Sequence, residues 1–198
     1  MVGGHQYYLH QYLLSLVVMR GFKVSKLNEK IYTVDFKGQH MELGPDYVGM
    51  FYCEWPIWKK TYLPSKKVMT LDGKTVLDAG AGNGETALFY FNAGAKKVIC
   101  IENSEDSVKL LEKNAKRNNW NVDIKCESFS LKHVKDNDFD FAKIDVEGAE
   151  KCLLELDRIT FPCVVEAHSS EIKDALCDKF GFKPIKRQGG LTTVSNCR

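Results

Sequence analysis

The pattern of apolar and polar positions changes near residue 74. From there on, short apolar runs alternate with segments in which apolar residues recur at helical spacing. The expected strands are 74–80, 96–102, 122–126, 139–145 and 163–168, followed by a hairpin within 182–195 that turns at Gly189 and Gly190; the expected helices are 85–94, 104–119, 149–156 and 170–181. This alternation predicts an α/β fold with a parallel sheet covered by helices, and such sheets bind ligands at the carboxyl ends of their strands.

The first 70 residues have a less regular pattern. They are expected to contain an apolar helix at 5–20, a strand pair at 22–27 and 30–36, and an aromatic-rich segment at 45–64. Pro56 and Pro64 interrupt that segment, so we expect it to be broken there. We therefore predict that residues 1–70 form a small N-terminal helical and hairpin extension, or lid, on a ligand-binding domain formed by residues 71–198.

Composition adds little to this picture and excludes some classes of function. The chain has 198 residues, of which 27% are charged, and its net charge is +2. This balance gives no electrostatic case for a nucleic acid or a membrane surface. The apolar stretch YLLSLVVM is too short to span a bilayer and lacks the features of a signal peptide. The seven cysteines contain no CxxC pair, so we expect small, buried, free thiols in a reducing cytoplasm and no zinc site.

The segment VLDAGAGNGET carries the first candidate chemistry. Asp78 falls at the end of an expected strand, and Gly80, Gly82 and Gly84 make the turn into the next helix. Glycine lets the backbone approach a ligand, and N–H groups at a helix start favour a carboxylate or phosphate. Glu85 stands where a dinucleotide-binding loop has its third glycine, and a carboxylate there would repel a pyrophosphate. The loop also lacks the Gly-Lys-Ser/Thr of a P-loop.

A second acidic residue narrows the choice of ligand. Glu102 ends the next expected strand, 24 residues after Asp78, where a carboxylate can hold both hydroxyls of a ribose. Asp78 itself suits a cationic amine. An amine, a carboxylate and an unphosphorylated ribose together describe S-adenosylmethionine, which we predict as the cofactor. Asn103 is a further candidate contact, although capping of the following helix is its expected role.

At this point the sequence resembles a known family. VLDAGAGNGET and VICIEN look like motifs I and II of the class I methyltransferases, and IDVEGAE and VVEAH are similar to the FkbM-type members. The resemblance covers about 74–180. It implies methyl transfer from S-adenosylmethionine, usually to a hydroxyl oxygen, on a Rossmann-like, mostly parallel seven-stranded sheet with helices on both faces. It also implies that Glu127, after the third strand, meets the adenine amine.

Three further residues are expected to lie beside the transferable methyl group. Asp145 ends the fourth strand of the domain, and Glu166 and His168 end the fifth, which is its neighbour in the class I order. Asp145 or His168 could act as the general base, with Glu166 beside them. The alternative is that the three hold a divalent metal ion, but we favour a site without a metal. Glu150 is expected to cap the helix that follows.

These observations predict an S-adenosylmethionine-dependent O-methyltransferase that acts on a small molecule or glycan, with residues 46–70 closing over the cofactor. One competing function is RNA methylation, which the basic residues Lys113, Lys116 and Arg117 would suit. The sequence DVEG, however, stands where base N-methyltransferases typically carry an N/D-P-P-Y/F motif. The other competitor is a module that binds S-adenosylmethionine without turnover.

Overall fold

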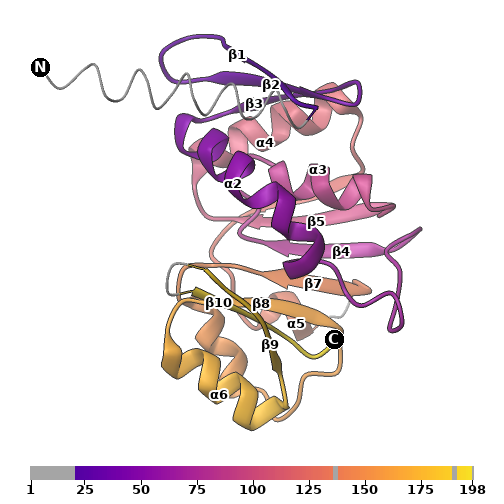
Figure 1. The fold of residues 1–198 in the computed structure, drawn as a ribbon, viewed down its shortest axis with the longest axis vertical. Coiled ribbons are helices and arrows are strands. Elements are labelled where there is room, and N and C mark those ends of the chain that lie inside the picture. Colours follow the sequence, from indigo (N-terminus) through magenta and orange to yellow (C-terminus); the bar gives the residue numbers. More distant parts are fainter. Residues whose placement is uncertain (1–20, 136–137, 189–190, 198) are drawn as a thin grey trace, which may run out of the picture.

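The computed structural model of the chain describes residues 21–135, 138–188 and 191–197 (Figure 1). Its larger sheet has seven strands: β4 (Thr75–Ala79), β5 (Lys97–Glu102), β6 (Val122–Cys126), β7 (Phe141–Ile144), β8 (Cys163–Ala167), β9 (Lys183–Gln188) and β10 (Leu191–Ser195). Their order is β6-β5-β4-β7-β8-β10-β9, and β10 runs antiparallel to both of its neighbours. The predicted α/β fold with a mostly parallel, seven-stranded sheet is therefore confirmed. The turn predicted at residues 189–190 lies outside the described residues.

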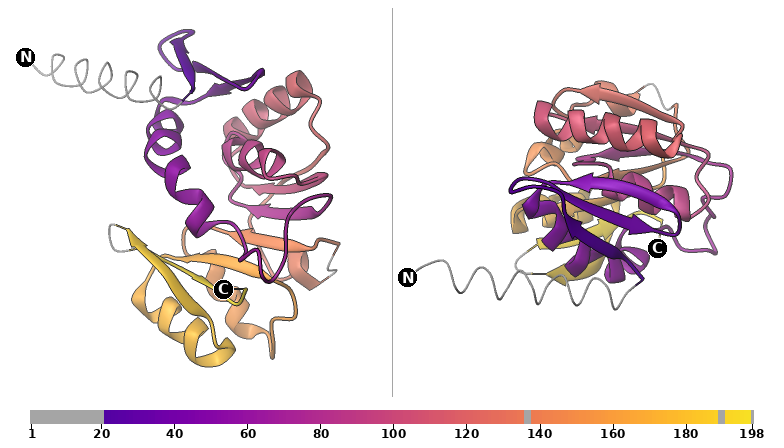
Figure 2. Two further views of the ribbon diagram at one scale, coloured as in Figure 1. Left: turned by 45° about the vertical axis from the view of Figure 1, so that its right-hand side comes forward. Right: turned by 90° about the horizontal axis from the view of Figure 1, so that it is seen from above.

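Helices flank this sheet on both faces (Figure 2). They are α3 (Glu85–Asn92), α4 (Glu105–Asn118), the short α5 (Lys132–Lys135), the 3-10 helix η1 (Ala149–Glu155) and α6 (Ser170–Phe180). The helices expected at 85–94, 104–119 and 170–181 are confirmed as α3, α4 and α6. The segment expected to be an α-helix at 149–156 is the 3-10 helix η1 instead, because it is a short connection for which i→i+3 bonds suffice.

The strand order determines where the candidate residues meet. β4 lies between β5 and β7, with Asp78 paired to Cys100 on one side and to Lys143 on the other. β8 lies on the far side of β7. Because parallel strands end at the same edge of a sheet, the residues that follow β4, β5, β7 and β8 come together there.

The N-terminal part forms a second, antiparallel sheet from β1 (Lys23–Lys26), β2 (Tyr32–Phe36) and β3 (Gln39–Leu43). The expected pair of strands is present, and β3 is an additional strand. The helix expected at 5–20 lies outside the described residues. α2 (Pro45–Thr61) then runs from this sheet towards the middle of the larger one (Figures 1 and 2).

The break predicted at Pro56 is wrong, because α2 continues through this residue. A proline removes one helical hydrogen bond, but the aromatic side chains of α2 are packed on both sides of it. The ring of Trp55 lies 4.9 Å from that of Phe51, and the rings of Trp55 and Trp58 both lie 5.5 Å from that of Phe89 in α3. This packing of α2 on α3 offsets the lost hydrogen bond.

The core does not divide at residue 70. Phe22, Val34 and Trp58 belong to the same buried cluster as Val76 and Phe89. The division into an extension and a domain stays a prediction, but the two parts share one hydrophobic core.

Polar contacts from α4 to β3 hold the N-terminal sheet in place. The Asn114 side chain accepts a hydrogen bond from the backbone N–H of Glu42 at 2.7 Å and donates to its carbonyl at 2.9 Å. Lys113 and Arg117 donate to the buried carboxylate of Glu42 at 2.7 and 2.9 Å. Two of the three basic residues that suited an RNA ligand are therefore engaged in an intramolecular ion pair.

Two further findings concern the cysteines and the length of the helices. Cys100 and Cys163 are buried thiols, as expected, but Cys126 at the end of β6 is exposed, so the expectation that every cysteine is buried is wrong. Over the described residues, no helix combines the length and apolarity that crossing a bilayer requires.

Candidate functional site

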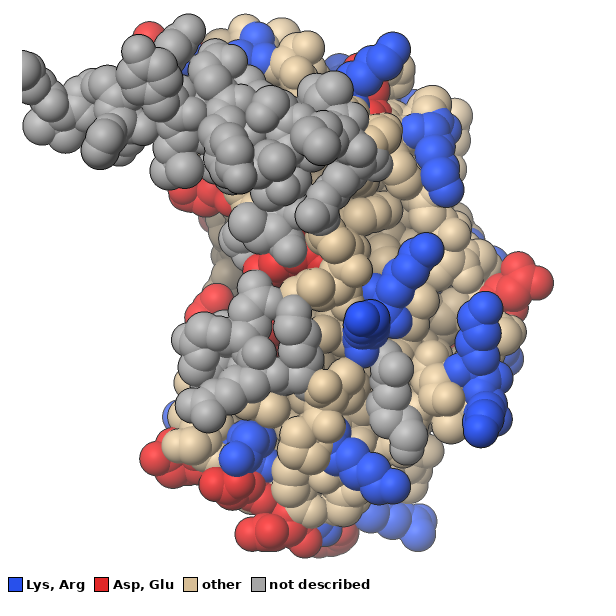
Figure 3. All heavy atoms as spheres, in the orientation of Figure 1, with Lys and Arg blue, Asp and Glu red and all other residues tan. Residues whose placement is uncertain are grey.

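A cavity of about 310 Å³ lies at the carboxyl ends of the parallel strands, between the glycine loop, β5, β7 and α2. Figure 3, in the orientation of Figure 1, shows a hollow at the left-hand edge of the molecule with acidic side chains beside it. The predicted site residues on the cavity wall are Gly80, Gly82, Glu102, Asn103, Glu127 and Asp145. The other predicted site residues do not line this cavity: Asp78, Gly84, Glu166 and His168. The volume falls at the lower end of the range for small-molecule sites.

The glycines of the loop are required by the protein itself. Gly80 has a φ of 78°, and a Cβ at this position would lie 1.8 Å from the backbone oxygen of Asp145. A Cβ on Gly82 would lie 2.5 Å from the carboxylate of Glu85 and 2.7 Å from the ring of Tyr47. The loop therefore packs tightly against β7, α2 and its own following residue, and close approach to a ligand is not the sole reason for the glycines.

Asp78 does not face the cavity. Its side chain is 0% exposed, and Thr86 Oγ1 donates a hydrogen bond to Oδ2 at 2.5 Å. Its other oxygen, Oδ1, faces the ammonium of Lys143 at 3.3 Å. Burial raises the pKa of Asp78, while Lys143 and Thr86 oppose that effect. Asp78 therefore joins the start of α3 to β7 from beneath the loop.

Lys143 is a site residue that the sequence analysis missed. It is 1% exposed, and its ammonium donates to the carbonyl of Gly80 at 2.7 Å. The same ammonium lies 3.6 Å from Asp145 Oδ2. Burial opposes its charge, but Asp78 and Asp145 outweigh burial and raise the pKa of Lys143 above its ordinary value. The signal available in the sequence was a single lysine within an apolar strand, FAKI.

Glu102 is positioned by two backbone groups. Its carboxylate accepts hydrogen bonds from the N–H of Gly82 at 2.9 Å and from the N–H of Ser104 at 2.8 Å. Each oxygen keeps a free lone pair, so both can still accept from a pair of hydroxyls at the cavity wall. The expected helix cap at Asn103 is wrong: Ser104 caps α4 and accepts from the N–H of Ser107 at 3.3 Å, while Asn103 is exposed on the wall.

Glu127 lies on the opposite part of the wall, beside Phe129. Lys132 and His133 both contact its carboxylate, His133 through Nε2 at 3.0 Å. These two hydrogen bonds, chiefly that from Lys132, lower the pKa of Glu127 to about 2. His133, which sequence reasoning left without a role, thus helps to hold Glu127 ionised.

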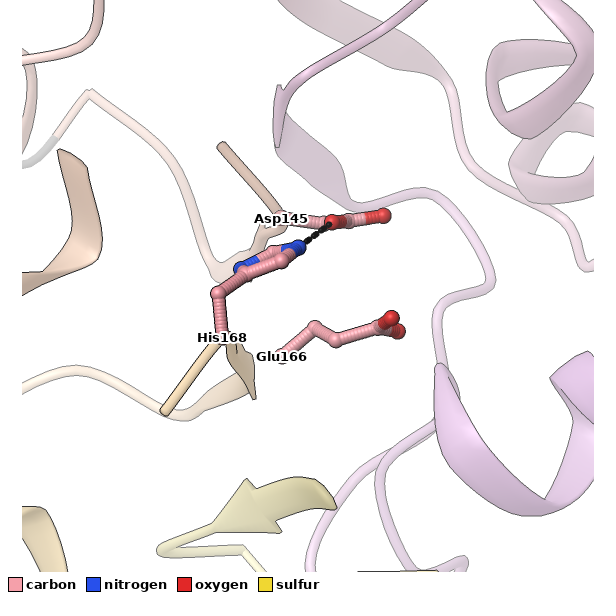
Figure 4. Close-up of side chains that lie close together, drawn as sticks. All are labelled: Asp145, Glu166 and His168. Carbon is pink, nitrogen blue, oxygen red and sulfur yellow. Dashed lines mark ion pairs between the residues drawn. The ribbon is translucent and has the colours of Figure 1, made fainter. Parts of the chain in front are cut away.

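Asp145, Glu166 and His168 point into one space from the ends of β7 and β8 (Figure 4). His168 Nε2 lies 3.4 Å from Asp145 Oδ1, and Nδ1 lies 3.1 Å from Glu150 Oε1. Glu150 also accepts from the backbone N–H groups of Gly148 at 2.7 Å and His168 at 2.9 Å. The hydrogen bond that His168 donates to Glu150 is the main reason why the pKa of His168 is raised to about 9. His168 is therefore an imidazolium at neutral pH, held between two carboxylates.

Tyr62, directly after α2, is a second residue that sequence reasoning missed. Its hydroxyl lies 3.1 Å from Asp145 Oδ2 and 2.9 Å from Glu166 Oε2. One hydroxyl proton cannot serve two carboxylates, so one of the two contacts needs a proton on the carboxyl group. Burial, followed by the charge of Asp145, raises the pKa of Glu166 to about 7. Glu166 is thus the carboxyl that takes up this proton near neutral pH, while Tyr62 donates to Asp145.

The same three residues offer a possible set of metal ligands. Asp145, Glu166 and His168 each present one ligand atom within 4.8 Å of the others. Two carboxylates and an imidazole suit a divalent transition metal. The ammonium of Lys143, 3.6 Å from Asp145, works against a further positive charge at this place.

With the geometry known, comparison with known proteins identifies the central part of the chain. Residues 76–153 match the family model described as a methyltransferase domain. Over these residues the chain is similar to a methyltransferase domain. This match supports S-adenosylmethionine as the cofactor, and the cavity is lined by residues of the matched segment, by residues of α2 and by Tyr62.

The curated relatives match part of this chain. A ribosomal protein L11 methyltransferase of Thermotoga maritima is 29% identical over 89 residues, which are 45% of this chain and 34% of the relative. A ribosomal protein arginine N-methyltransferase of Schizosaccharomyces pombe is 36% identical over 74 residues, which are 37% of this chain and 13% of the relative. The chain thus spans about a third or less of the length of these relatives.

Solved structures support the fold of the methyltransferase domain. A proposed methyltransferase in complex with S-adenosylhomocysteine aligns with a TM-score of 0.55 and 11% identity, covering 86% of this chain and 57% of that one. The C-terminal domain of precorrin-6Y C5,15-methyltransferase from Rhodobacter capsulatus aligns with a TM-score of 0.50 and 15% identity, covering 67% and 85% of the two chains.

Proposed function

We propose that this chain is an FkbM-type methyltransferase that transfers a methyl group from S-adenosylmethionine to a hydroxyl oxygen of a small molecule or glycan. The observation that carries this proposal is the position of Asp145. Its side chain is 22% exposed and opens into the cavity, while Tyr62, Lys143 and His168 fix its orientation from behind.

The cavity wall fits the parts of this cofactor. Glu102 has free lone pairs for the two ribose hydroxyls. Glu127, held ionised by Lys132, can accept from the adenine amine, and Phe129 and Ile101 offer apolar surface for the ring. We take α2 to be the lid of the site, because Tyr47, Glu54 and Trp58 line the same cavity.

The bound cofactor supplies an electrophilic methyl group, and the chain's own residues align the acceptor and take its proton. Alignment of the acceptor with the methyl group contributes most to the rate, since orientation alone can lower the activation barrier by roughly 7–11 kcal/mol. Asp145 accepts the proton of the acceptor hydroxyl through its partly exposed carboxylate. His168 acts as a positioning residue rather than a base, because it already holds a proton at neutral pH. Trp58 and Tyr62 exclude water from the reacting groups.

The test has two parts. Calorimetry should detect binding of S-adenosylhomocysteine and no comparable binding of NAD. Once labelled cofactor has revealed an acceptor, Asp145→Asn should lower turnover roughly a hundredfold or more and change affinity for S-adenosylhomocysteine only a few fold. Asp106→Asn is the matched control, because this aspartate is 93% exposed and does not line the cavity. Normal turnover of Asp145→Asn would contradict the proposed base.

Chelation separates the metal-free site from the metal-dependent alternative. Turnover that survives excess EDTA supports proton transfer to Asp145 without a metal. Turnover that is lost in EDTA and restored by a divalent cation would assign Asp145, Glu166 and His168 to the metal instead.

A second candidate acceptor is a basic side chain of a protein. The observation in its favour is the acidic wall of the cavity, whose carboxylate residues are Glu54, Glu85, Glu102, Glu127, Asp145 and Glu147. The matched relatives named as ribosomal protein L11 and arginine methyltransferases are consistent with such an acceptor. Mass spectrometry of the labelled product would separate an O-methyl from an N-methyl group and so decide between the two.

A further inference from the structure

Glu85, the first residue of α3, has no role in the methyl transfer to a hydroxyl oxygen proposed above. Its side chain is 5% exposed and lines the cavity beside the glycine loop. One carboxylate oxygen accepts a hydrogen bond from the N–H of Asn83 at 3.0 Å, and the other lies against Gly82. A buried carboxylate at the wall of a ligand cavity is costly unless a cation or hydrogen-bond donor compensates it.

Asp78, the residue expected to bind the cofactor's amine, is occupied elsewhere. Thr86 donates a hydrogen bond to one of its oxygens, the other lies 3.3 Å from the ammonium of Lys143 without a hydrogen bond, and its side chain has no exposed surface. An amine in the cavity would have to displace the ammonium of Lys143 to reach Asp78. Glu85 lies on the same side of the loop as the cavity and needs no such rearrangement.

We propose that Glu85, in place of Asp78, binds the cationic amine of the cofactor's amino-acid group. This inference rests on the proposed function, because it takes the cavity to be the S-adenosylmethionine site. No bond is made or broken in this contact. It is an ion pair strengthened by a hydrogen bond from the amine to the carboxylate.

The charged groups around Glu85 come from three elements. Lys143 on β7 and Asp78 on β4 act on its carboxyl with opposite signs, and Tyr47 on α2 lies nearby. Burial is the largest effect and raises the pKa of Glu85 to about 8. In the free protein at pH 7 the carboxyl therefore holds a proton, which it must release when an ammonium group binds. Affinity for the amine should consequently rise as the pH increases from 6 to 8.

Three ligands identify the group that Glu85 contacts. S-adenosylmethionine has a sulfonium and an amino-acid amine. S-adenosylhomocysteine keeps that amine but has no sulfonium, and 5′-methylthioadenosine has neither of these two groups. Glu85→Gln keeps an acceptor for the N–H of Asn83 but removes the charge. We expect this variant to weaken S-adenosylmethionine and S-adenosylhomocysteine alike, by roughly ten- to hundredfold, and to leave 5′-methylthioadenosine within about twofold.

Glu105→Gln is the matched control, because Glu105 is the first residue of α4 but is exposed and does not line the cavity. It should change none of the three affinities. If Glu85→Gln weakened the binding of S-adenosylmethionine but not that of S-adenosylhomocysteine, Glu85 would lie against the sulfonium and the inference would be overturned. Equal loss for all three ligands would make Glu85 a structural part of the loop, and no loss would remove it from the site.

A measurement on the unaltered protein guards against a variant that fails to fold. Calorimetry at pH 7 in buffers of different ionisation enthalpy should find that S-adenosylhomocysteine releases about one proton on binding and that 5′-methylthioadenosine releases none. Equal proton release for the two ligands would contradict the inference. Failure of both ligands to bind would instead overturn the proposed function.

Discussion

The charge on His168 is stabilised mainly by Glu150, and this leads to a prediction about pH and stability. Glu150 is fully buried, and Glu150→Gln removes the negative charge and keeps one acceptor oxygen for the backbone N–H groups of Gly148 and His168. We expect the variant to be destabilised at pH 6.5 and to lose the charge-dependent part of that difference by pH 9.5.

The magnitude and sign come from linkage. The pKa of His168 is raised from 6.5 to about 9, roughly 2.5 pKa units, and each unit corresponds to about 1.4 kcal/mol. A raised histidine pKa stabilises the folded state fully below pH 6.5, and this contribution is lost as the pH rises through 9. The contribution is thus up to about 3.5 kcal/mol, of which Glu150, the first cause, supplies the largest share.

Urea unfolding at several pH values measures the difference in free energy between the wild type and Glu150→Gln. Other groups titrate in the same window, including Glu85 and Glu166, but they are common to both proteins and cancel in the comparison. An NMR titration of the His168 ring measures its pKa directly. We expect a pKa of about 9 in the wild type and a pKa close to the ordinary value in the variant. A constant difference in stability from pH 6.5 to 9.5, or a wild-type pKa near 6.5, would refute the reasoning.

Three further predictions address other parts of the molecule. Glu102→Ala should weaken S-adenosylhomocysteine binding by roughly 1–3 kcal/mol, measured by calorimetry, and unchanged affinity would remove Glu102 from the ribose site. Asn114→Ala should lower the free energy of unfolding by roughly 2–4 kcal/mol in urea, because it leaves buried groups of Glu42 and Asn83 without partners; a loss below about 0.5 kcal/mol would show that this clamp is dispensable. Alkylation under denaturing, non-reducing conditions should modify all seven cysteines, and a native disulfide found by mass spectrometry would contradict the cytoplasmic setting that we propose.

The sequence by itself determined the fold of the central domain. Alternation of apolar runs and amphipathic segments from residue 74 predicted the strands and three of the connecting helices, because a parallel strand buried on both faces has to be apolar throughout. The order of the elements also fixed which strand ends meet. Gly80, Glu102 and Asp145 could be placed at the cavity for this reason alone.

Local sequence predicted secondary structure less well where tertiary packing overrides the helix propensity of individual residues. Pro56 is a helix breaker in isolation, yet α2 passes through it because Trp55 and Trp58 pack on the core. The segment 149–156 has the apolar spacing of a helix, but it is short and its Glu150 side chain turns back towards β8. These outcomes depend on contacts with residues that are distant in the chain.

The tertiary structure alone decided the partners of the acidic residues. Asp78 and Asp145 looked alike in the sequence, since each ends a strand, but Lys143 and Thr86 enclose the first and leave the second open to the cavity. Tyr62 reaches Asp145 across 83 positions of sequence, so no local pattern could signal it. A side chain's charge and exposure depend on what packs around it, and the strand-end pattern predicts where a residue lies but not its neighbours.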